Sequence, residues 1–180
     1  MKNLILLLAI AGVFNYVDDK QNVPQWNWYS PEAEVFKVEF PNLQGIEVKN
    51  RGIESMELKG RSFTSKMPLG LLKFDNMECE VFLGELAQSS YGTVEMDHDR
   101  IKDQIKRELL AQLVSEREID WLGYTAKEYV FDSKVSKKLA TVRMFYDRKQ
   151  NKLAQLIFVH PNNGDFRTEM ERFFGSFELI

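Results

Sequence analysis

One short segment of the chain gathers side chains that are suited to acid–base or metal chemistry. "EMDHDR" begins at Glu95 and carries the carboxylates of Glu95, Asp97 and Asp99 around the imidazole of His98. Carboxylates and imidazole bind divalent ions, so Glu95, His98 and Asp99 form a candidate metal set. Neighbouring residues point in different directions, however, and seldom share one ion. The pattern therefore favours the competing interpretation, an acidic helix start with a solvated histidine.

The rest of the sequence supplies no motif that would complete a catalytic site with these residues. The only histidines are His98 and His160, and "FGSFE" lacks the second glycine of a nucleophile elbow. No glycine-rich loop has the spacing that cradles a phosphate. An enzyme would need His98 and Asp99 to meet a distant carboxylate in one cleft. We therefore expect no enzymatic activity and no cofactor.

An aromatic cluster, "WNWY", offers a different kind of site. Trp26 and Trp28 are two residues apart, so on a strand they would share one face, with Tyr29 beside them. Exposed aromatic side chains often anchor protein partners or stack on sugars. The alternative is that the tryptophans cover a sheet edge within the fold. The sequence thus predicts a binding platform at Trp26, Trp28 and Tyr29 and leaves this structural role open.

Charge and cysteine content exclude several classes of protein. The chain has 24 Lys and Arg against 27 Asp and Glu, a net charge of −3, and lacks the dense positive charge of a nucleic-acid binder. Its longest basic cluster, Lys134 to Lys138, is typical of a hairpin end. The single cysteine, Cys79, excludes an internal disulfide and a thiolate metal cluster. Its neighbours Glu78 and Glu80 would suppress thiolate formation, so we expect a small core residue.

The first residues predict export. Lys2 precedes an apolar run from Leu4 to Phe14, which is shorter than the roughly 20 residues that span a bilayer. Ala9 and Ala11 supply the small-x-small pattern for cleavage before Gly12. We therefore expect a signal peptide at 1–11, a polar joint at 12–25, one domain at 26–180, and a periplasmic or secreted protein. An N-terminal core helix or strand is the alternative.

Strand patterns dominate the first half of the domain. Phe36, Val38 and Phe40 alternate with Lys37 and Glu39, as in a strand with one buried face. "SMELKGRSFTSKM" and "MECEVFLGEL" are further strand candidates. The period then changes, and apolar residues at helical spacing predict a long helix over 97–118, with the stripe Ile101, Ile105, Leu109 and Leu113.

Three strand candidates follow, namely "IDWLGYTAKEYVFD", "KKLATVRMFYD" and "LAQLIFVHP". "RKQNK" between the last two predicts an antiparallel hairpin. Arg143 lies in the second strand, and we expect it to face outward and to pair with a carboxylate across the sheet. A closing helix is expected at 164–175, ended by Gly175 in a left-handed conformation, with Phe177, Leu179 and Ile180 docking on the sheet. Together these elements predict an α+β fold, an α/β/α sandwich with a central, mostly antiparallel sheet.

Several segments resemble the PsbP-like superfamily. "YSPEAEVFKVEFPN" is similar to its opening strand, and "IDWLGYTAKEYVF", "TVRMFYDRKQNKLAQLIFV" and "ERFFGSFELI" are similar to its later course. The superfamily includes the extrinsic subunit of photosystem II, a Ran-binding nuclear-import factor and many exported bacterial proteins. The resemblance implies an α/β/α sandwich and a role in binding another protein, and it transfers no catalytic residue.

These observations lead to one functional hypothesis and one alternative. The first is a non-catalytic, exported accessory module that contacts a protein in the cell envelope. The alternative is a small-ligand or carbohydrate binder that uses the platform of Trp26, Trp28 and Tyr29.

Overall fold

The computed structural model describes residues 24–31, 36–53, 58–69, 76–86 and 94–180. The predicted signal peptide at 1–11 and most of the joint at 12–25 lie outside these residues. The elements are β1 (Asn27–Tyr29), β2 (Phe36–Phe40), β3 (Glu47–Ile53), β4 (Leu58–Pro68), β5 (Asn76–Leu86), α1 (Val94–Glu108), β6 (Gln112–Trp121), β7 (Tyr124–Ser133), β8 (Lys138–Asp147), β9 (Lys152–Pro161), α2 (Arg167–Ser176) and β10 (Glu178–Leu179).

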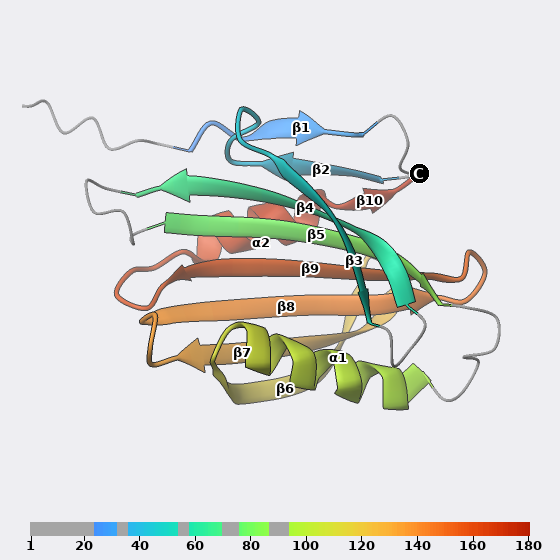
Figure 1. The fold of residues 1–180 in the computed structure, drawn as a ribbon. Coiled ribbons are helices and arrows are strands. Elements are labelled where there is room, and N and C mark those ends of the chain that lie inside the picture. Colours follow the sequence, from blue (N-terminus) through green and yellow to red (C-terminus); the bar gives the residue numbers. More distant parts are fainter. Residues whose placement is uncertain (1–23, 32–35, 54–57, 70–75, 87–93) are drawn as a thin grey trace, which may run out of the picture.

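The strands form two antiparallel sheets (Figure 1). The larger sheet has the order β3-β4-β5-β9-β8-β7-β6, and the smaller one has the order β1-β2-β10. Between β5 and its neighbour β9, the chain forms α1 and then β6, β7 and β8. These three strands complete one edge of the larger sheet. The predicted hairpin around "RKQNK" is confirmed, because Asp147 at the end of β8 pairs with Lys152 at the start of β9.

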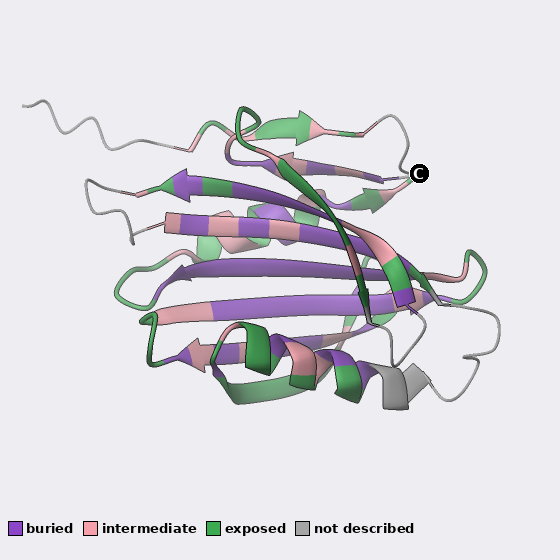
Figure 2. Cartoon of the chain, viewed as in Figure 1, coloured by how far each residue is buried: buried purple, intermediate pink, exposed green. Residues whose placement is uncertain are grey.

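A hydrophobic core lies on each face of the larger sheet. On one face, α2 contributes Phe173 to the first core, the smaller sheet contributes Phe36, and Phe177 joins them from the link between α2 and β10. On the other face, α1 contributes Ile101 and Ile105 to the second core. Figure 2 shows the consequence, since the central strands β8 and β9 are buried along most of their length. Strands that are covered on both faces carry nearly continuous apolar runs, as "LAQLIFV" does.

The expected α/β/α sandwich with a long helix at 97–118 is wrong. The fold is mostly β, with two antiparallel sheets and only two short helices in the described part of the chain. α1 ends at Glu108, and the last third of the expected helix is strand β6 instead. There Leu113 pairs with Phe131 of β7. Pairing along β7 outweighs the local helical pattern, because tertiary contacts override propensities of a few tenths of a kcal/mol per residue.

The closing helix α2 spans Arg167–Ser176, where the sequence predicted 164–175, and buries Phe173 and Phe174. The expected left-handed cap at Gly175 is wrong, because Gly175 lies inside the helix and Gly123 is the glycine with positive φ among the described residues. The chain leaves the helix at Phe177 in an extended conformation. Phe177 is buried and Leu179 half-buried, whereas Ile180 is 66% exposed.

Cys79 is a buried core residue of β5, as predicted. Burial, with a smaller contribution from the charge of Glu78, raises the pKa of its thiol well above the ordinary value. Neither α1 nor α2, the helices of the described residues, has the length and apolar character to cross a bilayer.

Candidate functional site

The outer face of the smaller sheet carries the predicted aromatic cluster. Strand alternation turns Phe36, Val38 and Phe40 inward and leaves Lys37 and Glu39 on the opposite face. Residues directly opposite each other on paired strands share a face. The outer face therefore also receives Trp28 of β1, which pairs with Glu39, and Glu178 of β10, which pairs with Lys37.

Trp28, Lys37 and Glu178 form one aromatic–cation–carboxylate group on this face. Lys37 Nζ lies 5.5 Å from the centroid of the Trp28 ring and 2.7 Å from Glu178 Oε2. The group crosses all three strands of the smaller sheet. Trp28 is 57% exposed, which is a large exposed fraction for the residue type that most often anchors protein interfaces.

Trp26, Arg172 and Glu39 form a second group of the same kind. The guanidinium carbon of Arg172 lies 5.4 Å from the centroid of the Trp26 ring. Its Nε and one terminal nitrogen donate to the two carboxylate oxygens of Glu39 at 2.7 and 2.9 Å. Such a two-pronged contact fixes the plane of the guanidinium. The hydrogen bond from Arg172 lowers the pKa of Glu39, so this carboxylate is charged at neutral pH.

The helix α2 is fixed against this face at a further point. The backbone N–H of Glu39 donates to Ser176 Oγ at 2.9 Å, and Ser176 Oγ itself donates to the carbonyl oxygen of Phe173 at 2.9 Å. Since Arg172 belongs to the same helix, strand β2 and helix α2 hold the second group from both sides. The two groups together, namely Trp26, Trp28, Lys37, Glu39, Arg172 and Glu178, are called the Trp face below.

The structure separates the three residues of the predicted platform. Trp28 is exposed on β1, and Trp26 lies just before that strand, half-buried against the first core. Tyr29 points the other way, with its ring 5.7 Å from that of Phe40 and 6.0 Å from that of Phe63. Tyr29 is therefore a packing residue behind the platform. The sequence pattern indicated the tryptophans, but it could not indicate Arg172, which lies more than 130 residues from Glu39.

The residues of the predicted metal set lie at the start of α1. His98 is buried, and Asp99 is exposed, with its carboxylate 2.6 Å from Lys102 Nζ. This hydrogen bond lowers the pKa of Asp99. Glu95 belongs to α1, but its side chain is outside the described residues. Within the described ranges, no group of three or more His, Cys, Asp or Glu side chains is arranged to hold a metal ion.

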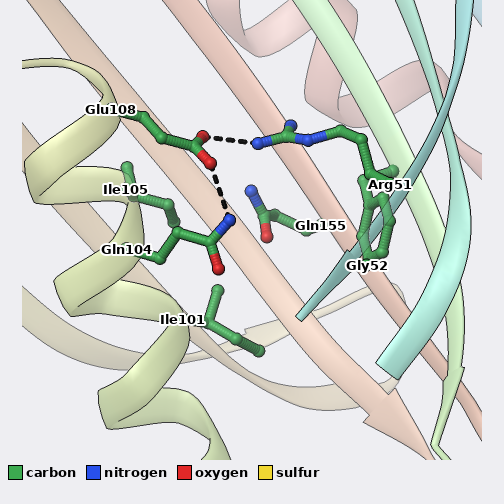
Figure 3. Close-up of a pocket in the computed structure, with 8 residues that line it drawn as sticks. Arg51, Gly52, Ile101, Gln104, Ile105, Glu108 and Gln155 are labelled. Carbon is green, nitrogen blue, oxygen red and sulfur yellow. Dashed lines mark hydrogen bonds and ion pairs between the residues drawn. The ribbon is translucent and has the colours of Figure 1, made fainter. Parts of the chain in front are cut away.

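A narrow pocket that the sequence did not predict lies between α1 and the larger sheet (Figure 3). Arg51 of β3 forms ion pairs with Glu80 of β5 and Glu108 of α1, and Gln104 Nε2 donates to the carboxylate of Glu108 at 2.6 Å. Burial raises the pKa of Glu80, although Arg51 opposes this effect. The lining residues are Arg51, Gly52, Phe82, Ile101, Gln104, Ile105, Glu108 and Gln155.

The size of this pocket argues against a substrate site. Its cavity volume is about 20 Å³, which is room for about one water molecule. The charge of Arg51 is already matched by two carboxylates. We interpret the ion pairs of Arg51 as contacts that hold α1 against the edge of the larger sheet.

Comparisons with known proteins identify no family for the chain, since no protein family and no curated protein matches it. Among solved structures, the crystal structure of PA94 from Pseudomonas aeruginosa, a protein of unknown function, is similar with a TM-score of 0.41 and 11% sequence identity. The match covers 81% of this chain and 88% of that chain. A similarity at this level supports no inference about function. The resemblance to the PsbP-like superfamily stays a prediction.

Proposed function

We propose that the protein is an exported, non-catalytic binding module that contacts another protein of the cell envelope through the Trp face. The observation that carries the proposal is the 57% exposure of Trp28 on an ordered strand, beside charged groups that neighbouring strands hold in place. A large aromatic side chain that is already ordered loses little conformational entropy on binding. Export rests on the predicted signal peptide at 1–11.

The positions of the cations favour a protein partner over a sugar. Carbohydrates stack on the open faces of aromatic rings, but Lys37 lies over the Trp28 ring and Arg172 lies over the Trp26 ring. Each ring therefore has one face occupied. Fixed charges of both signs around an aromatic anchor match the polar rim and apolar centre of protein interfaces. Carbohydrate binding remains the alternative that the experiment below distinguishes.

Site-specific photo-crosslinking in the producing cells tests this proposal. A photoreactive amino acid replaces Trp28 in one variant and Leu122 in the control, because Leu122 is also exposed, at 46%, but lies in the β6–β7 turn. We expect a discrete protein adduct from position 28 that is absent from position 122. Identical adducts from both positions, or none from either, would contradict the proposal.

A second measurement separates the two candidate ligands. With the crosslinked partner purified, Trp28→Ala should weaken its affinity by about tenfold or more, since interface tryptophans commonly contribute over 1.4 kcal/mol. Leu122→Ala should leave the affinity unchanged. A glycan array that binds the wild type but not Trp28→Ala, without any protein adduct, would instead establish the carbohydrate alternative. Sequencing the N-terminus of protein from the producing cells tests export independently, with Gly12 expected as the first residue.

A further inference from the structure

Two connections lie side by side at one end of the larger sheet, away from the Trp face. They are the link from α1 to β6 and the turn from β7 to β8, at the lower left in Figure 1. Ser133 Oγ, at the end of β7, donates to the carbonyl oxygen of Leu110 at 3.3 Å. The pairing of Gln112 with Asp132 continues this contact into the sheet. The two connections therefore form one continuous surface.

This surface projects apolar side chains into solvent. Leu110 is 67% exposed and Val135 is 76% exposed, one on each connection. Val114, at the irregularity in the pairing of β6 with β7, is 62% exposed nearby. Neither core takes up these side chains. Exposed apolar groups that gather in one place, instead of being scattered singly, mark an interaction site.

The backbone holds the apolar side chains in this position. Leu110 has a φ of 48° and Lys137 has a φ of 55°, a left-handed conformation that costs non-glycine residues energy and persists only where the surroundings enforce it. Ser133 supplies part of that enforcement, since its hydroxyl contacts Leu110 and accepts a hydrogen bond from the backbone N–H of Ser136.

Basic residues lie close to the apolar side chains along both connections. Lys106 and Arg107 occupy the last turn of α1, and Lys134 and Lys137 flank Val135, all of them exposed. Asp132 forms an ion pair with Lys134, and Asp103 is a second carboxylate close to Lys106. The chain as a whole carries a charge of −3, so this end departs from the average of the molecule. We name Lys106, Arg107, Leu110, Lys134, Val135 and Lys137 the basic tip.

We propose that the basic tip docks the protein on an anionic lipid bilayer. Leu110 and Val135 would enter the boundary between headgroups and acyl chains, while the four cations contact the lipid phosphates. Protruding apolar side chains within a ring of Lys and Arg are complementary to an anionic membrane surface. The depression beside Leu110, which is lined by Lys106 and Arg107, is open to solvent. Membrane docking would leave the Trp face free, because β1, β2 and β10 lie at the top of Figure 1, whereas the two connections of the tip lie at the lower left.

The test must read the tip itself, because the apolar run from Leu4 to Phe14 would bind lipid on its own. Cys79 is buried and its thiol has a raised pKa, so an introduced cysteine can be labelled selectively. An environment-sensitive fluorophore is attached in Val135→Cys and, as a matched control, in Leu122→Cys. Leu122 is, like Leu110, an exposed leucine with positive φ (54°), but it lies at the opposite end of β6.

The labelled full-length proteins are mixed with vesicles of phosphatidylcholine alone or with about one third phosphatidylglycerol. We expect the label at position 135 to shift to shorter wavelength on the anionic vesicles only, and the label at position 122 to stay unshifted. Added salt should reverse the shift, since it screens contacts with headgroups. A label at position 135 that stays in water on both kinds of vesicle, or shifts equally on both, would overturn the proposal.

Unlabelled variants then measure each contribution by vesicle sedimentation, as the excess of binding to anionic vesicles over binding to phosphatidylcholine vesicles, which subtracts lipid binding by the apolar run from Leu4 to Phe14. Leu110→Asn with Val135→Ser should weaken binding to anionic vesicles by about tenfold, and asparagine suits the positive φ of Leu110. Lys106→Gln and Lys134→Gln should each weaken it about fivefold, the equivalent of one cation near an anionic surface. The control variants Leu122→Asn and Lys149→Gln should bind as the wild type does. Equal binding by tip variants and controls would also overturn the proposal.

Discussion

Arg143 and Glu128 form an ion pair inside the protein, between neighbouring strands β8 and β7. Arg143 Nε lies 2.7 Å from Glu128 Oε2, and the two side chains are only 10% and 5% exposed. The guanidinium also lies 4.4 Å from the centroid of the Phe174 ring and 3.1 Å from the carboxylate of Glu171 on α2. The pair therefore links the larger sheet to the closing helix.

Removing the acidic partner should destabilise the fold strongly. In Glu128→Ala the charge of Arg143 stays buried and keeps only Glu171, whose side chain is 54% exposed. Loss of one partner of a buried ion pair typically costs about 3–5 kcal/mol. We expect a loss near the lower end of this range in the free energy of unfolding, measured by urea denaturation.

Arg117→Ala is the matched control, since Arg117 also contacts Glu128 but is 66% exposed. A surface ion pair contributes about 0–1 kcal/mol, so this variant should unfold almost as the wild type does. A loss below about 1 kcal/mol in both variants would show that water reaches Glu128 and that the pair is not a buried one.

The sequence predicted correctly that Arg143 pairs with a carboxylate across the sheet, but it did not predict that Arg143 is buried. Strand alternation places a carboxylate across the ladder, and Glu128 is indeed directly opposite Arg143. The expected outward orientation is wrong, because Arg143 is 8% exposed. The reason is α2, which covers this part of the sheet with Phe174 and Glu171. No local pattern within β8 reveals that a helix more than 20 residues later will cover it.

The packing of the last residues against the core can be tested by truncating Phe177. Phe177 is 2% exposed, and its ring stacks on Phe36 at 5.9 Å and on Trp121 at 6.0 Å. Phe177→Ala should lower the free energy of unfolding by about 3–5 kcal/mol, as phenylalanine truncations in cores do. Ile180→Ala, at an apolar residue that is 66% exposed, should change it by less than about 0.5 kcal/mol. A small effect at Phe177 would contradict the docking of this segment.

Where the sequence failed, the missing information was tertiary. The apolar period from Ile101 to Leu113 is compatible with a helix throughout, but the chain reverses at Leu110 with positive φ and joins β7. For the candidate site, the spacing of Trp26 and Trp28 was informative. The contact of Arg172 with Glu39 and the opposite orientation of Tyr29 follow from how β2, β4 and α2 pack. No rule of sequence spacing predicts these contacts.

The stability of the protein should depend on pH through His160. Burial lowers the pKa of His160 below its ordinary value, and its ring lies 5.0 Å from the ring of Phe166. The unfolded chain therefore binds a proton at a higher pH than the folded protein does. Stability from this residue is complete above about pH 7 and is lost as the pH falls through about 6.5, the value in unfolded chains.

Two measurements check this prediction. The NMR titration midpoint of the His160 ring should lie below about 6.5. The free energy of unfolding should fall between about pH 7 and 5, and His160→Gln should flatten that part of the profile. A midpoint above the ordinary value, or an unchanged profile in the variant, would mean that the charged imidazole is accommodated beside Phe166.

A substitution at Gly175 distinguishes two descriptions of the closing helix, because each predicts a different sign for the change in the free energy of unfolding. If Gly175 ended the helix in a left-handed conformation, as its sequence position indicated, an alanine there would strain the backbone and destabilise the protein. In the structure Gly175 has helical backbone, and a Cβ added to it meets no atom within 4 Å. Gly175→Ala should therefore raise the free energy of unfolding by about 0.5–1 kcal/mol, because alanine restricts the unfolded chain and favours helix. Thermal and urea unfolding of the variant measure the sign directly, and a decrease would return Gly175 to the role of a cap and end α2 at Phe174.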